Sequence, residues 1–236
     1  MSVRILIINA NTTESMTDDM VGQAQELCGP DCEVFGVTAE HGVASIDGYY
    51  DEALGAIAVT RAVQEHDGTF DAAVIACFGD PGIHAARELT DRPVVGIAEA
   101  SFIAAMTLGR RFSVLTTLDR GVPPIEEVVH RYGFGSRCAS VRATGLTVLE
   151  ADGDPERAIE ALEREGARAV AEDGADVLCL GCGGMVGLRE RLEQRLGLPV
   201  IEGVAVGVAL AAALVRCGLS TSKIRGFKAP EPNVYR

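Results

Sequence analysis

The sequence contains neither a basic cluster nor a long apolar run, and each absence excludes a class of function. Acidic residues number 34 against 21 basic ones, for a formal net charge of -13, which argues against a phosphate-backbone partner. The apolar stretch Ala205 to Val215 is well short of the roughly 20 residues that span a bilayer. Val3 to Ile8 is too short an apolar run for a signal peptide. We therefore expect a cytoplasmic protein that binds neither nucleic acid nor membranes.

The cysteine content argues against disulfides and against a metal site. The seven cysteines are an odd number, and a chain of 236 residues can bury a sufficient core without cross-links. We therefore expect reduced thiols. Cys179 and Cys182 form a lone Cys-x-x-Cys pair at a strand end, where strand alternation directs the two sulfurs to opposite faces, so redox chemistry is not expected. Zinc is not expected either, because no second pair stands at ligand spacing. Four others are interpreted as small buried apolar side chains: Cys28, Cys32, Cys138 and Cys217.

Short apolar segments alternate along the chain with amphipathic ones. Seven β-branched segments are predicted to be strands: residues 3–10, 32–39, 72–77, 92–99, 111–117, 175–182 and 198–205. They are apolar on both faces, which is typical of a parallel sheet covered by helices. Residues 155–174 are predicted to be a helix capped by Asp154, with Ile159, Leu162 and Val170 on one apolar stripe. The fold class is therefore α/β.

The chain repeats itself at a separation of 105 to 107 residues. Arg4 to Ile8 matches Arg111 to Leu115, Asp71 and Cys77 match Asp176 and Cys182, and Pro93 to Val95 matches Pro199 to Ile201. The order of these landmarks predicts two pseudo-symmetric lobes, each a mostly parallel sheet flanked by helices, with a cleft between them. The expected lobes are residues 1–97 plus 207–236 and residues 98–206.

Two strands end in a cysteine that is followed by glycines. Ligands of open parallel sheets bind beyond the carboxyl ends of the strands, so Cys77 and Cys182 are expected to face one another in the cleft. Backbone amides freed by Gly79, Gly183 and Gly184 favour negative charge. They are expected to lower the pKa of the thiols below the usual value of about 8.5. Two thiols on opposite sides of a small cleft suit proton exchange at a carbon beside a carbonyl, one removing the proton and the other returning it.

At these residues the sequence resembles the hydantoin and allantoin racemases of the aspartate/glutamate racemase superfamily. The resemblance covers essentially the whole chain and rests on a set of motifs: ILIINANTT, ACFGDPG, GIAEA, VLTT, GCGGM, VIEGV and GLSTSK. It departs from the family at Ala10, where the family usually has a proline. The resemblance implies a racemase that inverts C5 of 5-substituted hydantoins or allantoin, that needs no cofactor and that forms a homo-oligomer.

The resemblance also implies roles for individual residues. Cys77 and Cys182 match the two catalytic thiols, each acting as base for one enantiomer. The substrate is a small molecule, and seven residues are expected to bind it: Asn11, Phe78, Gly79, Thr116, Thr117, Gly183 and Gly184. The glycine amides are expected to meet the ring carbonyls, and the threonines are expected to add hydroxyl contacts.

Other polar residues near the motifs have structural interpretations. His84 is expected on the exposed face of a helix, and Asp80 is expected to cap that helix or to brace the turn before Pro81. Glu99 is interpreted as a structural contact. Thr221 to Lys223 is either part of the pocket rim or a solvated turn, and Lys228 to Arg236 is interpreted as an extended tail. The GCGGMVG stretch lacks the last glycine of a dinucleotide fingerprint, so no NAD is expected.

Two alternative functions remain open from the sequence. Relatives in the same superfamily racemise amino acids, decarboxylate arylmalonates or isomerise maleate. The pair of thiols argues against a single-thiol decarboxylase, and the Phe78-Gly79-Asp80 stretch argues against an amino-acid racemase. A two-lobed protein that binds a small molecule without chemistry is the other alternative.

Overall fold

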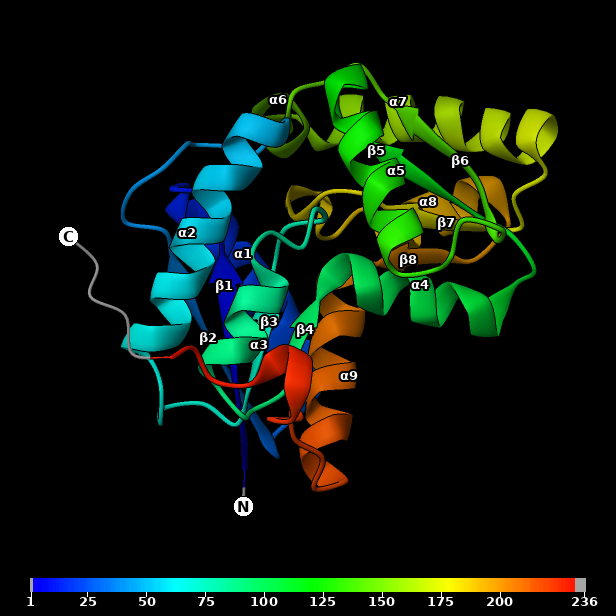
Figure 1. The fold of residues 1–236 in the computed structure, drawn as a ribbon. Helices are drawn as coiled ribbons and strands as arrows, with labels where there is room; N and C mark the ends of the chain where they lie inside the picture. The colour runs from blue at the N-terminus through cyan, green and yellow to red at the C-terminus, as the bar shows by residue number, and fades with distance from the viewer. Residues whose placement is uncertain (1, 232–236) are drawn as a thin grey trace.

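The computed structural model describes residues 2–231, and within them the chain forms two parallel four-stranded sheets. The two sheets have the same strand order. The first runs β2 (Cys32–Thr38), β1 (Val3–Asn9), β3 (Ala72–Ile75) and β4 (Val94–Gly96), and the second runs β6 (Cys138–Ala143), β5 (Phe112–Thr116), β7 (Val177–Leu180) and β8 (Val200–Glu202). Figure 1 shows the two sheets side by side, each flanked by helices. The predicted α/β class and the two matched lobes are confirmed.

The two repeated aspartates make the same contact in each lobe. The Asp71 carboxylate accepts a hydrogen bond from the Arg4 amide at 2.8 Å, and the Asp176 carboxylate accepts one from the Arg111 amide at 2.8 Å. Each aspartate therefore ties the start of one strand to the neighbouring strand. This duplicated tie explains why the aspartates hold nearly the same spacing from the repeated strands.

Helices cover both faces of each sheet. The elements associated with the first sheet are α1 (Glu14–Cys28), α2 (Tyr49–Glu65), α3 (Ile83–Leu89), α9 (Gly203–Arg216) and η4 (Arg225–Phe227). Those associated with the second are α4 (Ile97–Leu108), η1 (Asp119–Gly121), α5 (Val122–Arg131), α6 (Val148–Gly153), α7 (Pro155–Arg168), η2 (Ala169–Asp173), η3 (Gly183–Met185) and α8 (Arg189–Leu196). The helix α9 follows the second sheet but packs against α1, α4 and β3 (Figure 1). The chain therefore returns to the first lobe at its end.

The apolar core is continuous between the lobes. One cluster joins β1, α1 and α9 of the first lobe to α4, β5, α5 and β7. Separate clusters fill the space under α2 and α3 and the space under α7 and α8. Burial of such surface contributes on the order of 25 cal/mol per Å², so the central cluster holds the lobes together. The predicted division at residues 97/98 and 206/207 stays a prediction.

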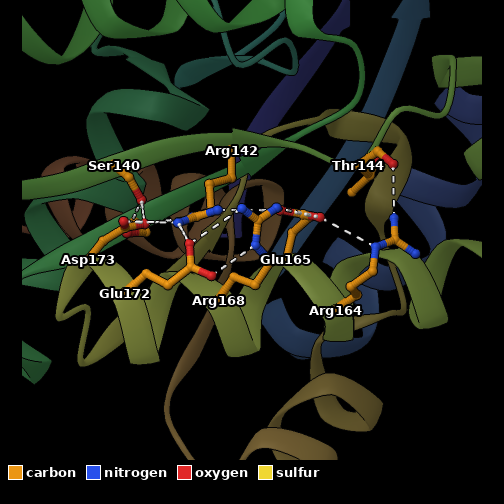
Figure 2. A network of polar contacts seen from close by, with 9 residues as sticks. Ser140, Arg142, Thr144, Arg164, Glu165, Arg168, Glu172 and Asp173 are labelled. Carbon is orange, nitrogen blue, oxygen red and sulfur yellow. Dashed lines mark hydrogen bonds and ion pairs between the residues drawn. The ribbon is translucent and has the colours of Figure 1, made fainter.

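Several predicted strands are too long, and one strand was missed. The predicted strands 92–99 and 198–205 end at Gly96 and Glu202, where α4 and α9 begin. The edge strand β6 escaped notice because its side chains are all half-buried and because Ser140 and Arg142 interrupt its apolar residues. Figure 2 shows the reason: Arg142 on β6 pairs with Asp173 at 2.6 Å and with Glu172 at 2.7 Å. A charged cluster thus adds to the apolar packing of Cys138 and Val141 at this edge.

The predicted helix at 155–174 forms, with one error in its apolar stripe. The Asp154 carboxylate accepts a hydrogen bond from the Arg157 amide, so the cap is confirmed. Ile159 and Leu162 are buried, but Val170 is 40% exposed. The α-helical turns of α7 give way at Ala169 to the π-helical turn η2. The wider turn shifts the helical phase, and Ala169 is buried in place of Val170.

The cysteine predictions were partly wrong. Cys28 ends α1 and Cys32 begins β2, and the tight turn between them holds the two Cα atoms 5.7 Å apart in a disulfide. That spacing lies within the range for disulfides. Cys217 is exposed and Cys138 is partly buried, whereas Cys179 is fully buried in β7. Cys179 and Cys182 are both free thiols.

Two remaining features concern the end of the chain and the length of the helices. Lys228 to Glu231 form no helix or strand, and residues 232–236 of the predicted tail lie outside the described residues. In the part of the chain that the structure describes, no helix combines the length and the apolar character needed to cross a membrane.

Candidate active site

Cys77 and Cys182 come from opposite lobes and line one pocket. Each follows the carboxyl end of a matched strand, Cys77 after β3 and Cys182 after β7. The pocket has a cavity volume of about 50 Å³. Seven further residues that were predicted as substrate contacts also line it: Asn11, Phe78, Gly79, Thr116, Thr117, Gly183 and Gly184. Their roles in binding and catalysis stay predictions.

A glycine permits the close approach of the two lobes at this pocket. A Cβ atom on Gly183 would lie 2.5 Å from the carbonyl oxygen of Ala76, the residue before Cys77. No real Cβ makes so close a contact with a backbone oxygen. Gly183 therefore lets the turn after β7 rest directly on the end of β3, which brings the two cysteine-bearing turns together.

The pKa values of the two thiols differ from the prediction. Burial raises the pKa of Cys77 far above its usual range and raises that of Cys182 to about 11. The predicted amide contacts exist: the Gly184 amide donates to the Cys182 sulfur at 3.4 Å, and the Gly79 amide lowers the pKa of Cys77. Desolvation outweighs them. The prediction of thiols with lowered pKa values is therefore wrong for the ligand-free protein.

Negative charges on neighbouring groups act in the same direction as burial. The Glu52 carboxylate contributes to the raised pKa of Cys77, and the Asp47 carboxylate contributes to that of Cys182. The pKa of Glu52 is itself raised by burial, while Arg131 opposes the shift. Each thiol therefore faces an acidic side chain, which makes its thiolate scarce at neutral pH but strongly basic.

Asp47 and Glu52 line the pocket and were not singled out from the sequence. They lie in the loop 39–48 and in the first turn of α2, about thirty residues before Cys77 in the chain. No motif marks them, because their chemistry depends on α2 folding back over the cysteine-bearing turns. The lining residues contain these two acids and no Lys, Arg or His.

Asn11 is held by hydrogen bonds at the pocket wall, whereas the Phe78 ring packs beneath the pocket. The Asn11 side-chain oxygen accepts hydrogen bonds from the Asn9 side chain at 3.1 Å and from the Thr13 amide at 2.9 Å. The fixed Asn11 side chain leaves its amide nitrogen facing Met16. The Phe78 ring is only 3% exposed and packs edge-on against Phe102, so the ring belongs to the core beneath the pocket.

Asp80 caps a helix, but not the helix that the sequence suggested. Its carboxylate accepts hydrogen bonds from the amides of Ala98 and Glu99, at 3.1 and 3.0 Å, and so caps α4 rather than α3. Tyr132 from the second lobe donates to the same carboxylate at 2.8 Å. Burial raises the pKa of Asp80 to about 7, opposed by these three donors. The turn after β3 points the side chain inward, away from α3, with Asp80 at φ 46°.

The second lobe also holds this turn from outside. Arg131 at the end of α5 donates a hydrogen bond to the Gly79 carbonyl at 3.0 Å. Together with the bond from Tyr132 to Asp80, this contact fixes the turn that follows Cys77. The position of one thiol in the first lobe thus depends on two residues of the second.

The remaining polar candidates lie outside the pocket. His84 is exposed on α3 and stacks on Phe227, and Glu99 forms an ion pair with Arg87 at 2.5 Å, as expected for structural roles. Thr221 and Lys223 do not line this pocket. The Thr221 hydroxyl donates to the Arg92 carbonyl in the loop between α3 and β4. The Lys223 ammonium donates to the Arg87 and Glu88 carbonyls, which the end of α3 leaves without a helical partner.

Nothing in the described residues resembles a metal centre. Over residues 2–231, no group of three or more His, Cys, Asp or Glu side chains is placed to hold a metal ion. The chemical groups available in the pocket are two thiols on opposite sides, two carboxyl groups, two threonine hydroxyls, the Asn11 side-chain amide and a set of glycine amides. These groups can move protons and bind polar, uncharged atoms.

Comparison with known proteins places this geometry in a family. The profile described as Asp/Glu/Hydantoin racemase matches residues 5–211. A hydantoin racemase from Pseudomonas sp. (strain NS671) is 45% identical over 99% of this chain and 94% of its own length. The crystal structure of allantoin racemase from Pseudomonas fluorescens superposes with a TM-score of 0.97 at 46% identity, covering 99% of this chain and 100% of that one.

Two further structures show how far the likeness extends, the first a near relative and the second similar in fold alone. Allantoin racemase from Klebsiella pneumoniae still superposes with a TM-score of 0.96 at 39% identity, covering 100% of this chain and 96% of that one. Glutamate racemase from Francisella tularensis has a TM-score of 0.63 at 16% identity, over 94% of this chain and 85% of that one. The family profile matches most of the chain, and the hydantoin racemase aligns with nearly all of it. The chain therefore belongs to the Asp/Glu/hydantoin racemase family.

Proposed function

We propose that the protein is a racemase that inverts C5 of 5-substituted hydantoins, allantoin included, without a cofactor. The observation that carries the proposal is that Cys77 and Cys182, from matched strands of the two lobes, line one pocket. Relatives of 45% and 46% identity are a hydantoin racemase and an allantoin racemase. A binding protein would have no use for two thiols at equivalent strand ends.

The proposed reaction transfers one proton across the substrate. One cysteine enters the reaction as a thiolate and takes the C5 proton, and the C5–H electron pair becomes part of an enolate at the adjacent carbonyl. The opposite cysteine, as a thiol, gives its proton to the other face of C5. The negative charge passes from one sulfur to the other, and no oxidant or reductant is consumed. Glycine amides at the turns stabilise the enolate oxygen.

The charge of the pocket favours a neutral substrate. Amino acids and malonates carry carboxylates, which acidic neighbours disfavour and which cationic partners or several hydrogen-bond donors stabilise when they are buried. The lining residues instead include Asp47 and Glu52 and no cationic side chain. A hydantoin ring offers uncharged carbonyls and N–H groups, and its C5 proton lies beside a carbonyl. The pocket is therefore better matched to hydantoins than to the acyclic acids that related enzymes use.

We also propose that the enzyme works in the cytoplasm as a homo-oligomer. The acidic composition and the short apolar runs support the location, and the resemblance to hydantoin and allantoin racemases supports assembly. The Cys28–Cys32 disulfide is a point against a reducing compartment. Light scattering after size-exclusion chromatography measures the assembly, and a monomeric mass at working concentration would contradict it.

The proposed function is tested by proton exchange in D2O. Single enantiomers of allantoin and of 5-benzylhydantoin are followed by optical rotation and by the C5 proton signal. The expected result is loss of rotation together with deuterium incorporation, well above an enzyme-free control. The double variant Cys77→Ser/Cys182→Ser is the matched protein control. If neither substrate changes faster than the controls, the hydantoin assignment is wrong.

A further inference from the structure

Glu52 places a carboxyl group beside the turn that carries Cys77. It lies in the first turn of α2 and lines the pocket together with that cysteine. Its carboxylate lies against the α-carbon of Gly79, where a Cβ atom would collide with Glu52 Oε1. The amide of the same glycine interacts with the Cys77 sulfur, and the charge of Glu52 acts on that thiol. The carboxylate and the sulfur therefore both lie next to Gly79.

The oxygens of Glu52 are free to exchange protons with water. Neither oxygen forms a hydrogen bond or an ion pair within residues 2–231, and the carboxyl group is influenced by burial and by the charges of Arg131 and Glu127. The side chain is half-buried, yet Asp47 Oδ1 is the one fully buried side-chain oxygen in this range that lacks a partner. Both oxygens of Glu52 thus keep accessible surface. The carboxyl group extends from the Cys77 turn to water.

The acid beside the other thiol is held differently. The charge of Asp47 acts on Cys182. Its Oδ1 atom is buried, and its Oδ2 atom accepts a hydrogen bond from the Ser45 hydroxyl at 2.8 Å. Of the two acids in the pocket lining, Glu52 alone has both oxygens unpaired and accessible. A route for protons through a carboxyl group therefore exists beside Cys77.

The proposed reaction leaves the thiols in the wrong protonation state for a second turnover of the same enantiomer. When Cys77 removes the C5 proton, it ends as a thiol and Cys182 ends as a thiolate. Before the next molecule reacts, Cys77 must lose that proton and Cys182 must gain one. Burial raises the pKa of Cys77 far above its usual range, so direct loss of the proton to water is slow. A carboxylate accepts the proton faster, because it is a stronger base than water.

We propose that Glu52 carries protons between the Cys77 sulfur and solvent, and that it resets the enzyme between turnovers without acting on the substrate. The inference rests on the proposed function and adds a residue to it. In the reset, the S–H bond of Cys77 breaks, the proton passes to the Glu52 carboxylate, and the resulting carboxylic acid releases it to water. Cys182, which is partly exposed, takes a proton from water. The net charge of the pocket is the same before and after.

The first test separates the reset from the chemistry. Initial rates are measured for the wild type and Glu52→Gln with one enantiomer of allantoin or 5-benzylhydantoin, whichever racemises faster. The reset follows product release, so it limits kcat and does not enter kcat/KM. We expect the substitution to lower kcat about 10- to 100-fold and to change kcat/KM less than about threefold. Loss of the charge makes the Cys77 thiolate more abundant but less basic, and these two effects oppose each other in kcat/KM.

Chemical rescue provides the second test. Glu52→Ala leaves room for a small carboxylic acid beside Cys77. Added formate should raise kcat of this variant about five- to tenfold and should leave kcat of the wild type unchanged. Glu65→Gln is the matched control, because it removes an exposed carboxylate at the other end of α2, outside the pocket. Both constants of this control should equal those of the wild type.

The outcomes separate this inference from the proposed function. Equal losses in kcat and kcat/KM would show that Glu52 binds the substrate or supports the fold, and would overturn the inference while leaving the racemase intact. An unchanged kcat in Glu52→Gln, or no response of Glu52→Ala to formate, would overturn it as well. A wild type that racemises neither substrate would overturn the proposed function itself, and the inference with it.

Discussion

The two cysteine-bearing turns occupy the same place in the two lobes and differ in their surroundings. After β3, the turn at Cys77 contains the buried Asp80 and is held by two residues of the second lobe. After β7, the turn at Cys182 is the short helix η3, with the Gly184 amide on the sulfur. Burial raises the pKa of Cys77 more than that of Cys182. Equal positions in a repeated fold therefore do not produce equal thiols.

This difference has a consequence for the proposed reaction. As the pH rises in the ligand-free protein, Cys182 loses its proton before Cys77. The enantiomer whose C5 proton faces Cys182 therefore meets the thiolate that forms more easily. The other enantiomer requires the charge to lie on Cys77. The two directions of racemisation therefore start from enzyme forms that differ in abundance, one with the Cys182 thiolate and one with the Cys77 thiolate. The equilibrium in water still contains equal amounts of the two enantiomers.

The largest expected effect comes from removing either thiol. Cys77→Ser and Cys182→Ser should each lower racemisation about 100- to 10,000-fold, because a hydroxyl is a poor proton carrier at neutral pH. Each variant should still exchange the C5 proton of one enantiomer with solvent, and the two variants should choose opposite enantiomers. Proton NMR in D2O measures this. Cys138→Ser, outside the pocket, is the control. Undiminished racemisation in either variant would exclude the two-thiol mechanism.

The next effect is a dependence of activity on pH. Because the pKa of Cys182 is raised to about 11, the thiolate fraction grows about tenfold per pH unit below that value. We expect kcat/KM, corrected for uncatalysed exchange, to rise about 100-fold between pH 6.5 and 8.5. A flat profile would show that a thiolate already exists at neutral pH. Iodoacetamide labelling with peptide mapping should modify Cys182 faster than Cys77 at alkaline pH.

A smaller effect should come from adding a methyl group to one turn. In Gly183→Ala, the new Cβ would meet the Ala76 carbonyl at 2.5 Å, and a backbone atom cannot easily move aside. We expect a loss of about 1 to 3 kcal/mol in the free energy of unfolding, measured in urea. Gly184→Ala is the matched control, since its nearest contact would be 3.6 Å. Equal stability of the two variants would contradict the close approach of the lobes.

The corresponding substitution in the first lobe, Gly79→Ala, should cost less stability. A Cβ atom on Gly79 would meet the Glu52 carboxylate, the far end of a flexible side chain. Gly79→Ala should therefore be less destabilising than Gly183→Ala, although the two glycines lie in corresponding turns. A larger cost for Gly79→Ala would show that Glu52 is held more rigidly than its surroundings suggest.

The smallest effect is expected for Tyr132→Phe, which removes one donor to Asp80. The loss should be about 1 to 2 kcal/mol above pH 7, because the charged carboxylate then loses one of its three donors. At pH 5 the loss should be smaller, since Asp80 with a pKa of about 7 is mostly neutral there. The hydroxyl lowers the pKa of Asp80 in the folded state, so the difference between the proteins grows as pH rises. Chemical denaturation at both pH values measures it, with the exposed Tyr50→Phe as the control. A loss that does not depend on pH would contradict the assigned partner.

The sequence alone predicted the strands with the strongest apolar character, and it failed where polar residues interrupt apolar ones. Residues 3–10 were predicted well because β1 is central and apolar on both faces. The edge strand β6 was missed because Arg142 and its acidic partners hold it in place. Val170 was assigned to the wrong face because a π-helical turn cannot be read from a pattern that assumes 3.6 residues per turn.

The candidate site was predictable in part for a similar reason. The repeat and the strand ends identified Cys77 and Cys182 without knowledge of distances. Asp47 and Glu52 were missed because they enter the pocket from the loop before α2 and from its first turn. Asp80 was assigned to the nearest helix in sequence, whereas its partners lie at the start of α4 and at Tyr132.

The sequence by itself determined the α/β class, the two-lobed repeat and the two cysteines at equivalent strand ends. These features follow from local periodicity and from spacing along the chain, which do not depend on distant contacts. Only the tertiary structure decided the acidity of the thiols, the helix that Asp80 caps and the Cys28–Cys32 disulfide. Desolvation, charge interactions and hydrogen bonds depend on which groups meet in space, and folding brings together groups that lie far apart in the sequence.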